Sequence, residues 1–408
     1  MTLEPTTNFK DSNGVDLGTK LVTKDYLISV YPEIGDKIGI PPELWTWGYG
    51  DSGRLGNAST TNRSTPVTTF SGGTNWKQVS GGPGVTAAIK TDGTLWTWGN
   101  GAYGQLGNSS TTNRSTPITT FAGGTNWKQV SAGNGLTSAI KTDGTLWTWG
   151  TGTSGRLGNG VTTGTISTPV TTFAGGTNWK QVSGGGFHTA AIKTDGTLWT
   201  WGNNASGQLG NASTTNRSTP VTTFAGGNNW KQVSAGFEFT AAIKTDGTLW
   251  LWGKGSSGQL GNNSNGDRST PVTTFAGGTN WKQVGATGEY PAAIKTDGTL
   301  WVWGFSLGGR LGTGEPPFTT KFTPVTTFAG GTNWKQVSSG FNHTTAIKTD
   351  GTLWTWGQNS SGQLGNAKTT DVSTPVTTFA GGTNWKQVSN ESSAYTVAIK
   401  SVDFTGAY

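Results

Sequence analysis

The pattern Leu-Trp-x-Trp-Gly occurs seven times along this chain, at intervals of 51 to 53 residues. A second pattern, Asn-Trp-Lys-Gln-Val, also occurs seven times, and the three tryptophans of each copy account for all 21 in the sequence. A repeat of about 50 residues with glycine and aromatic punctuation is typical of propeller blades or of a solenoid. The first pattern begins at Leu44, Leu95, Leu146, Leu198, Leu249, Leu300 and Leu353.

Each repeat is predicted to form four short strands. Trp-Lys-Gln-Val-Ser forms the first, Ala-Ala-Ile-Lys the second, Thr-Leu-Trp-Thr-Trp the third and Thr-Pro-Val-Thr-Thr-Phe the fourth. Thr-Asp-Gly joins the second strand to the third, and Asp-Gly between β-type segments is a strong hairpin signal because glycine accepts positive φ. A proline such as Pro66 near the start of the fourth strand fits the exposed edge of a blade, where its missing N–H does no harm.

The two ends of the repeat array favour a closed ring over an open solenoid. Thr-Asp-Gly occurs only six times; residues 44–48 are a third strand with no second strand before it, and residues 397–400 are a second strand with no third strand after it. Joining them completes a seventh blade and removes an exposed sheet edge. We therefore expect an all-β, closed seven-bladed propeller of four-stranded antiparallel blades over residues 44–400. A docking segment over 1–43 and a tail over 401–408 would flank it.

These motifs resemble the regulator of chromosome condensation repeat family over residues 44–400. Gly186-Phe187-His188-Thr189, the following Asp-Gly and Trp-Gly pairs, and Gln208-Leu209-Gly210-Asn211 follow its Gly-x-x-His-Thr … Asp-Gly … Trp-Gly-x-Asn … Gly-Gln-Leu-Gly pattern. The resemblance implies the propeller fold but no particular chemistry. The family includes a nuclear guanine-nucleotide exchange factor, a plant ultraviolet photoreceptor and a bacterial β-lactamase inhibitor, and function depends on sites carried by a shared fold.

Nearly all differences among the seven copies lie in the loops after the first and third strands, which share one end of the ring, here called the variable face. Several of the substituted residues are large aromatics and carboxylates, so we expect a recognition surface rather than neutral drift, which remains the alternative. The candidate binding residues are Tyr49, Val85, Tyr103, Leu136, Phe187, His188, Phe237, Glu238, Phe239, Glu289, Tyr290, Phe305, Phe318, Phe341, His343 and Tyr395.

The opposite end, here called the lysine face, carries the Thr-Asp-Gly turns and the Gly-Gly-Thr-Asn returns. Lys77, Lys90 and their equivalents place 14 lysines there against six turn aspartates. Such a ring attracts polyanions. It is more often a solvated surface, and nucleic acid is not an expected partner because arginines interleaved with aromatics are absent.

Catalysis, cofactors and metal sites are not expected. The chain has no cysteine, and its two histidines, His188 and His343, occupy the same repeat position in different blades, so they cannot act together. The tryptophans lie within strands at fixed positions of the repeat, so they are predicted to pack between blades. A photoreceptor role is not expected, because the Gly-Trp-Arg-His-Thr segments of the photoreceptor are missing. Exchange-factor activity is not expected either, since no blade carries an inserted β-wedge.

Residues 1–43 differ in composition from the repeats and contain Asp16-Leu17-Gly18, Val22-Thr23-Lys24-Asp25-Tyr26-Leu27 and Val30-Tyr31-Pro32. This arrangement looks similar to the N-terminal segments of phage virion proteins. They predict a docking strap for a non-enzymatic virion protein of a phage tail, fibre or capsid, present in many copies and contacting other virion proteins or a host-surface protein or glycan. No signal peptide or membrane insertion is expected, because no apolar run approaches ~18 residues. The alternative is a free bacterial protein-binding or inhibitor propeller. The candidate docking residues are Leu17, Val22, Lys24, Asp25, Tyr26, Leu27, Tyr31 and Pro32.

Overall fold

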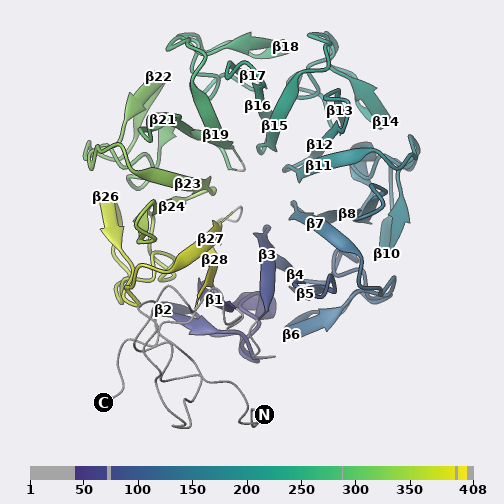
Figure 1. Cartoon of the computed structure of the whole chain (residues 1–408), viewed down its shortest axis with the longest axis horizontal. Coiled ribbons are helices and arrows are strands. Elements are labelled where there is room, and N and C mark those ends of the chain that lie inside the picture. The colour runs from purple at the N-terminus through teal and green to yellow at the C-terminus, as the bar shows by residue number, and fades with distance from the viewer. Residues whose placement is uncertain (1–41, 71–74, 287, 391–393, 402–408) are drawn as a thin grey trace, which may run out of the picture.

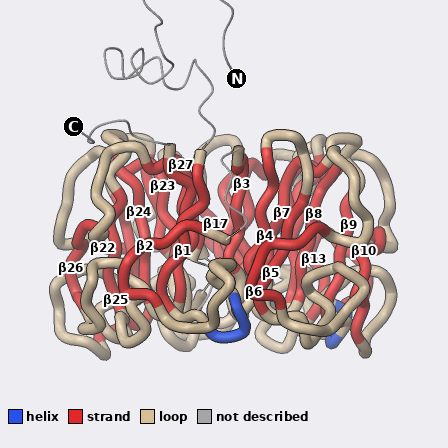
Figure 2. Tube along the Cα trace, turned by 90° about the horizontal axis from the view of Figure 1, so that it is seen from below, coloured by secondary structure: helices blue, strands red, loops and turns tan. Residues whose placement is uncertain are grey.

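The computed structural model describes residues 42–70, 75–286, 288–390 and 394–401. Seven four-stranded antiparallel sheets surround a central axis and form a closed propeller (Figure 1). The expected all-β fold is confirmed: the described residues contain no α-helix, only the short 3-10 turns η2 (Asp51–Gly53) and η3 (Thr153–Gly155). Both turns lie at the same end of the ring, which is the variable face (Figure 2). Within these ranges no helix is both long and apolar enough to cross a lipid bilayer.

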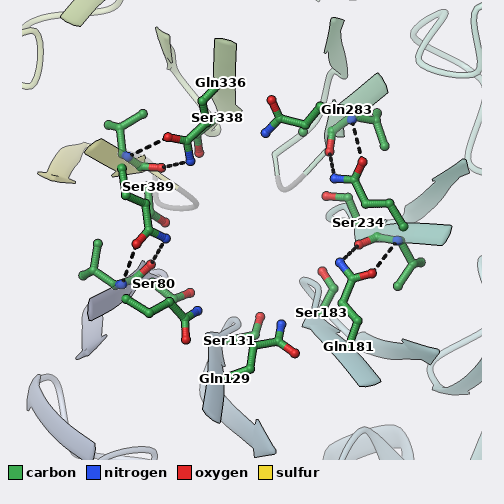
Figure 3. A pocket seen from close by; sticks show the side chains of 18 of the residues that line it. Ser80, Gln129, Ser131, Gln181, Ser183, Ser234, Gln283, Gln336, Ser338 and Ser389 are labelled. Carbon is green, nitrogen blue, oxygen red and sulfur yellow. Dashed lines mark hydrogen bonds between the residues drawn. The ribbon is translucent and has the colours of Figure 1, made fainter. Parts of the chain in front are cut away.

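The innermost strand of each blade follows from the Trp-Lys-Gln-Val-Ser segment. Its tryptophan and valine are buried between blades, whereas the glutamine and serine line the central channel (Figure 3). From the glutamine to the serine this is the period-2 pattern of a strand with two different faces, and the tryptophan falls out of phase because the strand pairing is irregular between it and the glutamine, as between Trp76 and Gln78. The innermost strands are β3 (Trp76–Gly81), β7 (Trp127–Ala132), β11 (Trp179–Gly184), β15 (Trp230–Ala235), β19 (Trp281–Gly285), β23 (Trp334–Ser339) and β27 (Trp385–Ser389).

The second strands are buried along their whole length except for the final lysine. The Thr-Asp-Gly turn that follows requires glycine: Gly93 has φ +81°, and a Cβ there would lie 2.0 Å from the Thr125 carbonyl oxygen. Asp92 Oδ1 accepts bonds from both Thr94 N–H and Thr94 Oγ1–H, which closes the turn. The second strands are β4 (Val85–Lys90), β8 (Leu136–Lys141), β12 (His188–Lys193), β16 (Phe239–Lys244), β20 (Ala292–Lys295), β24 (His343–Lys348) and β28 (Tyr395–Lys400).

The third strands carry the Leu-Trp-x-Trp-Gly pattern. The leucine and the second tryptophan are buried, whereas the first tryptophan is partly exposed. The third strands are β1 (Glu43–Gly48), β5 (Leu95–Gly99), β9 (Leu146–Thr151), β13 (Leu198–Gly202), β17 (Leu249–Gly253), β21 (Leu300–Ser306) and β25 (Leu353–Gly357).

The fourth strands form the outer edge of the ring, where the proline was predicted. The pairing of the third and fourth strands is irregular beside this proline, as between Thr46 and Gly48, and no ladder bond to its missing N–H is needed. The fourth strands are β2 (Arg63–Thr68), β6 (Arg114–Thr119), β10 (Thr165–Thr171), β14 (Arg217–Thr222), β18 (Arg268–Thr273), β22 (Thr319–Thr326) and β26 (Val372–Thr377).

Strands from the two ends of the described chain complete the seventh blade. Its order is β2-β1-β28-β27, and β1 pairs antiparallel with β28 from Glu43↔Lys400 to Gly48↔Tyr395. The predicted closure is confirmed. We number the other blades 1 (β3–β6), 2 (β7–β10), 3 (β11–β14), 4 (β15–β18), 5 (β19–β22) and 6 (β23–β26).

The tryptophans hold neighbouring strands and blades together, as predicted. Trp76 packs edge-on against Trp96 and is tilted against Trp98, with ring centroids 6.4 and 6.2 Å apart. Trp98 Nε1 donates to the Arg54 carbonyl oxygen of the preceding blade at 3.0 Å. Lys90 Nζ lies 4.9 and 4.6 Å from the Trp76 and Trp96 ring centroids, so this lysine covers the tryptophan pair as well as carrying charge. Equivalent lysine–tryptophan contacts occur in all seven blades.

Candidate binding face

Seven of the sixteen candidate residues lie beneath the variable face rather than on it. All occupy one repeat position, the start of the second strand or the residues just before it, and their side chains are 0% or 1% exposed. They cannot touch a partner while the propeller is closed, so the interpretation of these seven as binding residues is wrong and a packing role replaces it. They are Val85, Leu136, His188, Phe239, Tyr290, His343 and Tyr395.

The polar members of this buried set join one blade to the next. His188 Nε2 lies 2.7 Å from Thr240 Oγ1, and Tyr290 Oη lies 2.6 Å from the equivalent Thr344 Oγ1. Thr240 Oγ1 donates its own hydrogen to the Gln208 carbonyl oxygen, so it accepts from His188 Nε2–H and fixes a neutral tautomer. Burial lowers the pKa of His188 to about 3, with the nearby Arg156 charge acting in the same direction.

His343 repeats this arrangement in blade 6. Its Nε2 lies 2.7 Å from Thr396 Oγ1, and burial lowers its pKa to about 3. The Nδ1 atoms of both histidines are buried, and neither has a hydrogen-bond partner in the described part of the chain. Each histidine is therefore a neutral packing residue, closed off from any substrate that the variable face could hold.

Three phenylalanines converge at the end of the central channel on the variable face. Phe237 of blade 4 packs edge-on against Phe187 of blade 3 and Phe341 of blade 6, with ring centroids 4.7 and 4.8 Å apart. Phe341 also borders a small hollow between the loops of blades 1, 2 and 3, so it reaches across the axis. All three rings are partly exposed. We call this cluster the phenylalanine trio.

Arg156 holds the loop of blade 3 that carries Phe187. Its guanidinium lies 5.1 Å from the Phe187 ring centroid, and its Nη1 donates to the carbonyl oxygens of Asn134 and Gly186 at 3.0 and 3.1 Å. Burial lowers the pKa of Arg156 to about 10, which leaves it charged at neutral pH. This cation has no carboxylate partner among the described residues, so carbonyl dipoles and the ring face stabilise it.

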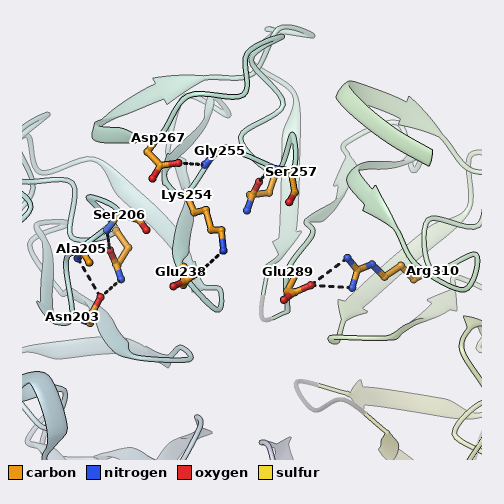
Figure 4. Close-up of polar contacts among 12 residues, drawn as sticks. Asn203, Ala205, Ser206, Glu238, Lys254, Gly255, Ser257, Asp267, Glu289 and Arg310 are labelled. Carbon is orange, nitrogen blue, oxygen red and sulfur yellow. Dashed lines mark hydrogen bonds and ion pairs between the residues drawn. The ribbon is translucent and has the colours of Figure 1, made fainter. Parts of the chain in front are cut away.

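Arg310 plays the same part for blade 6. Its Nη1 donates to the Phe341 carbonyl oxygen, and its guanidinium lies 4.8 Å from the Tyr290 ring centroid. Arg310 Nη2 is 3.5 Å from Glu289 Oε2 (Figure 4). Burial lowers the pKa of Arg310, opposed by Tyr290 and Glu289. The two arginines thus hold the backbone of two loops that present the trio.

Charged side chains lie near the trio. Lys254 Nζ is 2.6 Å from Glu238 Oε2, and both side chains are partly exposed (Figure 4). This contact is the main reason why the pKa of Lys254 is raised, with Glu289 adding to it through its charge. Glu238, Lys254 and Glu289 therefore form a polar rim beside an apolar centre, the arrangement found in protein interfaces.

The remaining predicted residues are exposed further from the trio. Tyr49 (38% exposed) is covered on one side by the Arg54 guanidinium, 4.8 Å from its ring centroid. Tyr103 is 53% and Phe318 69% exposed, and the Phe318 ring lies 6.4 Å from that of Phe305. The nine candidate residues that are not buried therefore share the variable face but do not form one continuous patch.

Two features were not predicted from the sequence. The buried arginines Arg54, Arg156 and Arg310 were missed, although a signal was present, because these blades carry Arg-Leu-Gly where the other four carry Gln-Leu-Gly. A belt of phenylalanines, 68–74% exposed, lies just after the outer strands. Its members, set by the repeat itself, are Phe70, Phe121, Phe173, Phe224, Phe275, Phe328 and Phe379.

Within the described ranges no three side chains of histidine, cysteine, aspartate or glutamate cluster as metal ligands would. The predicted docking residues lie outside the described residues, and their role stays a prediction. They are Leu17, Val22, Lys24, Asp25, Tyr26, Leu27, Tyr31 and Pro32.

Comparisons with known proteins agree with the fold. The chain matches the RCC1-like domain over residues 163–403 and the regulator of chromosome condensation (RCC1) repeat over 43–89 and 92–140. Among solved structures, human WBSCR16 superposes with a TM-score of 0.77 at 20% identity, covering 88% of this chain and 99% of that one. Yeast RCC1 (Prp20), solved with Kap60, superposes with a TM-score of 0.75 at 20% identity, covering 89% and 90%.

Sequence relatives include the ultraviolet-B receptor UVR8 of Arabidopsis thaliana, 30% identical over 338 residues, which cover 81% of this chain and 64% of the receptor. The X-linked retinitis pigmentosa GTPase regulator of Canis lupus familiaris is 31% identical over 144 residues, 35% of this chain and 14% of that protein. The chain thus spans less than two thirds of either relative. These relatives are a receptor and a regulator, so the expectation of a phage virion protein is wrong. The chain belongs to the RCC1-like family of seven-bladed propellers built from regulator of chromosome condensation repeats.

Proposed function

We propose that this chain is a non-catalytic propeller that binds a protein partner through its variable face, with the phenylalanine trio as the anchor. This proposal corresponds to the alternative predicted from the sequence, a free bacterial propeller that binds or inhibits another protein. The observation that carries the proposal is the trio itself: Phe187, Phe237 and Phe341 come from three blades, meet at the axis and stay partly exposed.

Preorganisation is the physical reason to assign binding to this cluster. Aromatic anchors dominate interface energetics when they are held rigidly and ringed by polar groups. Arg156 bonds the Gly186 carbonyl oxygen and Arg310 bonds the Phe341 carbonyl oxygen, so two loops lose little entropy on binding. Glu238 and Lys254 supply the polar rim. We expect a partner that inserts an apolar side chain at the trio and places charged groups around it.

The relatives support a protein as the partner class. Yeast RCC1 (Prp20) was solved bound to Kap60, and a structure of Prp20p is described with its binding to Gsp1p and histones. A propeller that binds another protein requires a preformed face but no reacting groups of its own.

The test is quantitative affinity capture from a lysate of the source organism, comparing the full chain with F237A and with F224A. Phe237 lies in the trio, whereas Phe224 lies in the belt, is 69% exposed and serves as the matched control. We expect a set of proteins captured equally by the wild type and F224A but reduced about tenfold or more with F237A, as for an interface anchor. Equal capture by all three proteins would remove the trio from the binding site.

A further inference from the structure

The central channel is lined by a closed belt of amide bonds. Gln78 Nε2 donates to the Val130 carbonyl oxygen, and Gln78 Oε1 accepts from Val130 N–H, both at 2.8 Å. The same two bonds link every blade to the next, and Gln387 closes the circle on Val79 (Figure 3). Each glutamine uses one amide hydrogen in this way, so its second N–H has no partner within the described residues.

A ring of serines lies two residues further along each innermost strand. Ser80 Oγ accepts from Ala132 N–H at 3.0 Å, and five other serines accept in the same way from the next blade. Gly285 replaces the serine in blade 5, where Ser339 Oγ–H donates to the Gly285 carbonyl oxygen instead. The six accepting serines are buried, and their hydroxyl hydrogens have no acceptor in the described structure.

The residues that line the channel therefore offer N–H and O–H donors and include no carboxylate. The phenylalanine trio closes its end at the variable face, because Phe341 packs on Phe237 and borders the loops of blades 1 to 3. In the described part of the chain, the end at the lysine face is the open one. Seven exposed lysines stand there, each one residue before a channel glutamine, and three of them line one hollow together with Gln336 and Gln387.

Six of these seven inner lysines have no acidic partner within ion-pair distance in the part of the chain that the structure describes. The nearby turn aspartates already have partners: Thr94 and then Lys90 hold the pKa of Asp92 below its usual value, and the other five turns repeat this. The six lysines are Lys77, Lys128, Lys180, Lys231, Lys282 and Lys335.

We propose that the mouth of the channel on the lysine face binds a multivalent phosphate anion, a short chain or cluster of phosphate groups. The lysine ring supplies charge, and the free amide N–H and hydroxyl groups inside supply donors to phosphate oxygens. A cation is disfavoured because lysines surround the entrance and no carboxylate lines the channel. This site is separate from the protein-binding face and lies at the other end of the axis, so both can be occupied together.

The test is isothermal titration calorimetry of the full chain with inorganic tripolyphosphate at low salt. The triple variant K128Q/K231Q/K335Q removes three inner lysines, and R114Q/R217Q/R268Q removes the same charge from exposed outer strands away from the mouth. Because each charge near a phosphate contributes a few-fold, we expect the lysine variant to lose about tenfold or more in affinity. The arginine variant should stay within about twofold of the wild type. Circular dichroism checks the fold, and the single variants K128Q and K335Q should each lose about twofold to threefold.

Co-sedimentation with phosphatidylcholine vesicles, with and without phosphatidylinositol bisphosphate, separates the two sources of such an anion. Binding to the phosphoinositide vesicles that tripolyphosphate displaces assigns the site to a lipid headgroup, and binding of tripolyphosphate alone assigns it to a soluble phosphate. No heat with tripolyphosphate, or equal losses in the lysine and arginine variants, would overturn the proposal. Neither of these results bears on the variable face, which F237A tests independently.

Discussion

Two buried histidines predict how the stability of this propeller depends on pH. His188 and His343 are 0% exposed, and each donates from Nε2–H to a threonine hydroxyl of the next blade. Protonation would place a second N–H on Nδ1, which has no acceptor in the described structure. The folded chain therefore resists taking up these two protons, whereas the unfolded chain takes them up freely.

The direction and size of this change in folding stability with pH follow from the pKa values of the histidines in the unfolded and folded chain. In the unfolded chain each histidine has its ordinary pKa of 6.5, and in the folded chain burial lowers that pKa to about 3. Below pH 6.5 the unfolded state binds more protons, so stability that is present at pH 7 is lost as the pH falls toward 3. Between pH 7 and pH 5 the loss is about 2 kcal/mol for each histidine, or about 4 kcal/mol for both. The turn aspartates, with pKa values below 3.8, lose their contribution only under more acidic conditions.

The repeats supply the control. Tyr290 and Tyr395 occupy the same position in blades 5 and 7, and each reaches the equivalent threonine through a hydroxyl that does not titrate in acid. We would measure the free energy of unfolding in urea at pH 7 and pH 5 for the wild type and for H188Y/H343Y. Between pH 7 and pH 5 the free energy of unfolding of the wild type should fall by about 4 kcal/mol more than that of H188Y/H343Y. Each single variant keeps one histidine, so its free energy of unfolding should fall by about 2 kcal/mol more than that of the double variant. If H188Y/H343Y loses as much as the wild type, the acid sensitivity does not come from these histidines.

Two further predictions concern the channel and the arginines. Replacing Gln181 by leucine removes its bonds to Val233 N–H and to the Val233 carbonyl oxygen; we expect about 1–3 kcal/mol less stability in urea denaturation, and an unchanged value would show that channel water replaces the amide fully. Replacing Arg156 by glutamine, the residue found in four other blades, removes the bond to the Gly186 carbonyl oxygen. Amide exchange around Phe187 should become faster while the innermost strands keep their protection, and unchanged exchange there would contradict a supporting role.

The ring and its closure could be predicted because every repeat carries the same local signals. The Asp-Gly turns and the unpaired strands at the two ends of the array leave one arrangement in which these end strands pair with each other. The error about the variable face came from ignoring the alternation of side chains at the start of the second strand. Phe187 and Glu238 point outward, whereas their neighbours His188 and Phe239 point inward and are buried. A parity argument on the sequence would have separated these adjacent residues, but not Phe237 and Phe341, which lie two residues before the buried Phe239 and His343.

The meeting of the phenylalanine trio could not be predicted in this way. Phe237 and Phe341 belong to blades 4 and 6, and their contact depends on how far the loops lean toward the axis. In blade 5 the corresponding residue is Gly288, whose missing side chain lets the loop of blade 6 approach: a Cβ there would lie 2.0 Å from the Gly340 carbonyl oxygen. Phe237 and Phe341 are more than a hundred residues apart in the sequence, and their contact depends on how the loops between the blades pack. No local sequence pattern therefore predicts it.

One buried position per blade explains how a uniform ring acquires a single asymmetric site. Where the residue before Leu-Gly is glutamine, as at Gln105, the side chain folds back and accepts from the Tyr103 N–H of its own loop. At Arg156 and Arg310 the longer side chain bonds into the next blade, to Gly186 and to Phe341, whereas the hydrogen bonds of Arg54 stay with Asp51 of its own loop. These are the loops that carry two members of the trio, and the third, Phe237, is held between their rings. At Arg156 and Arg310 the exchange of glutamine for arginine therefore ties one loop to the loop of the next blade, and the trio forms where these two ties meet.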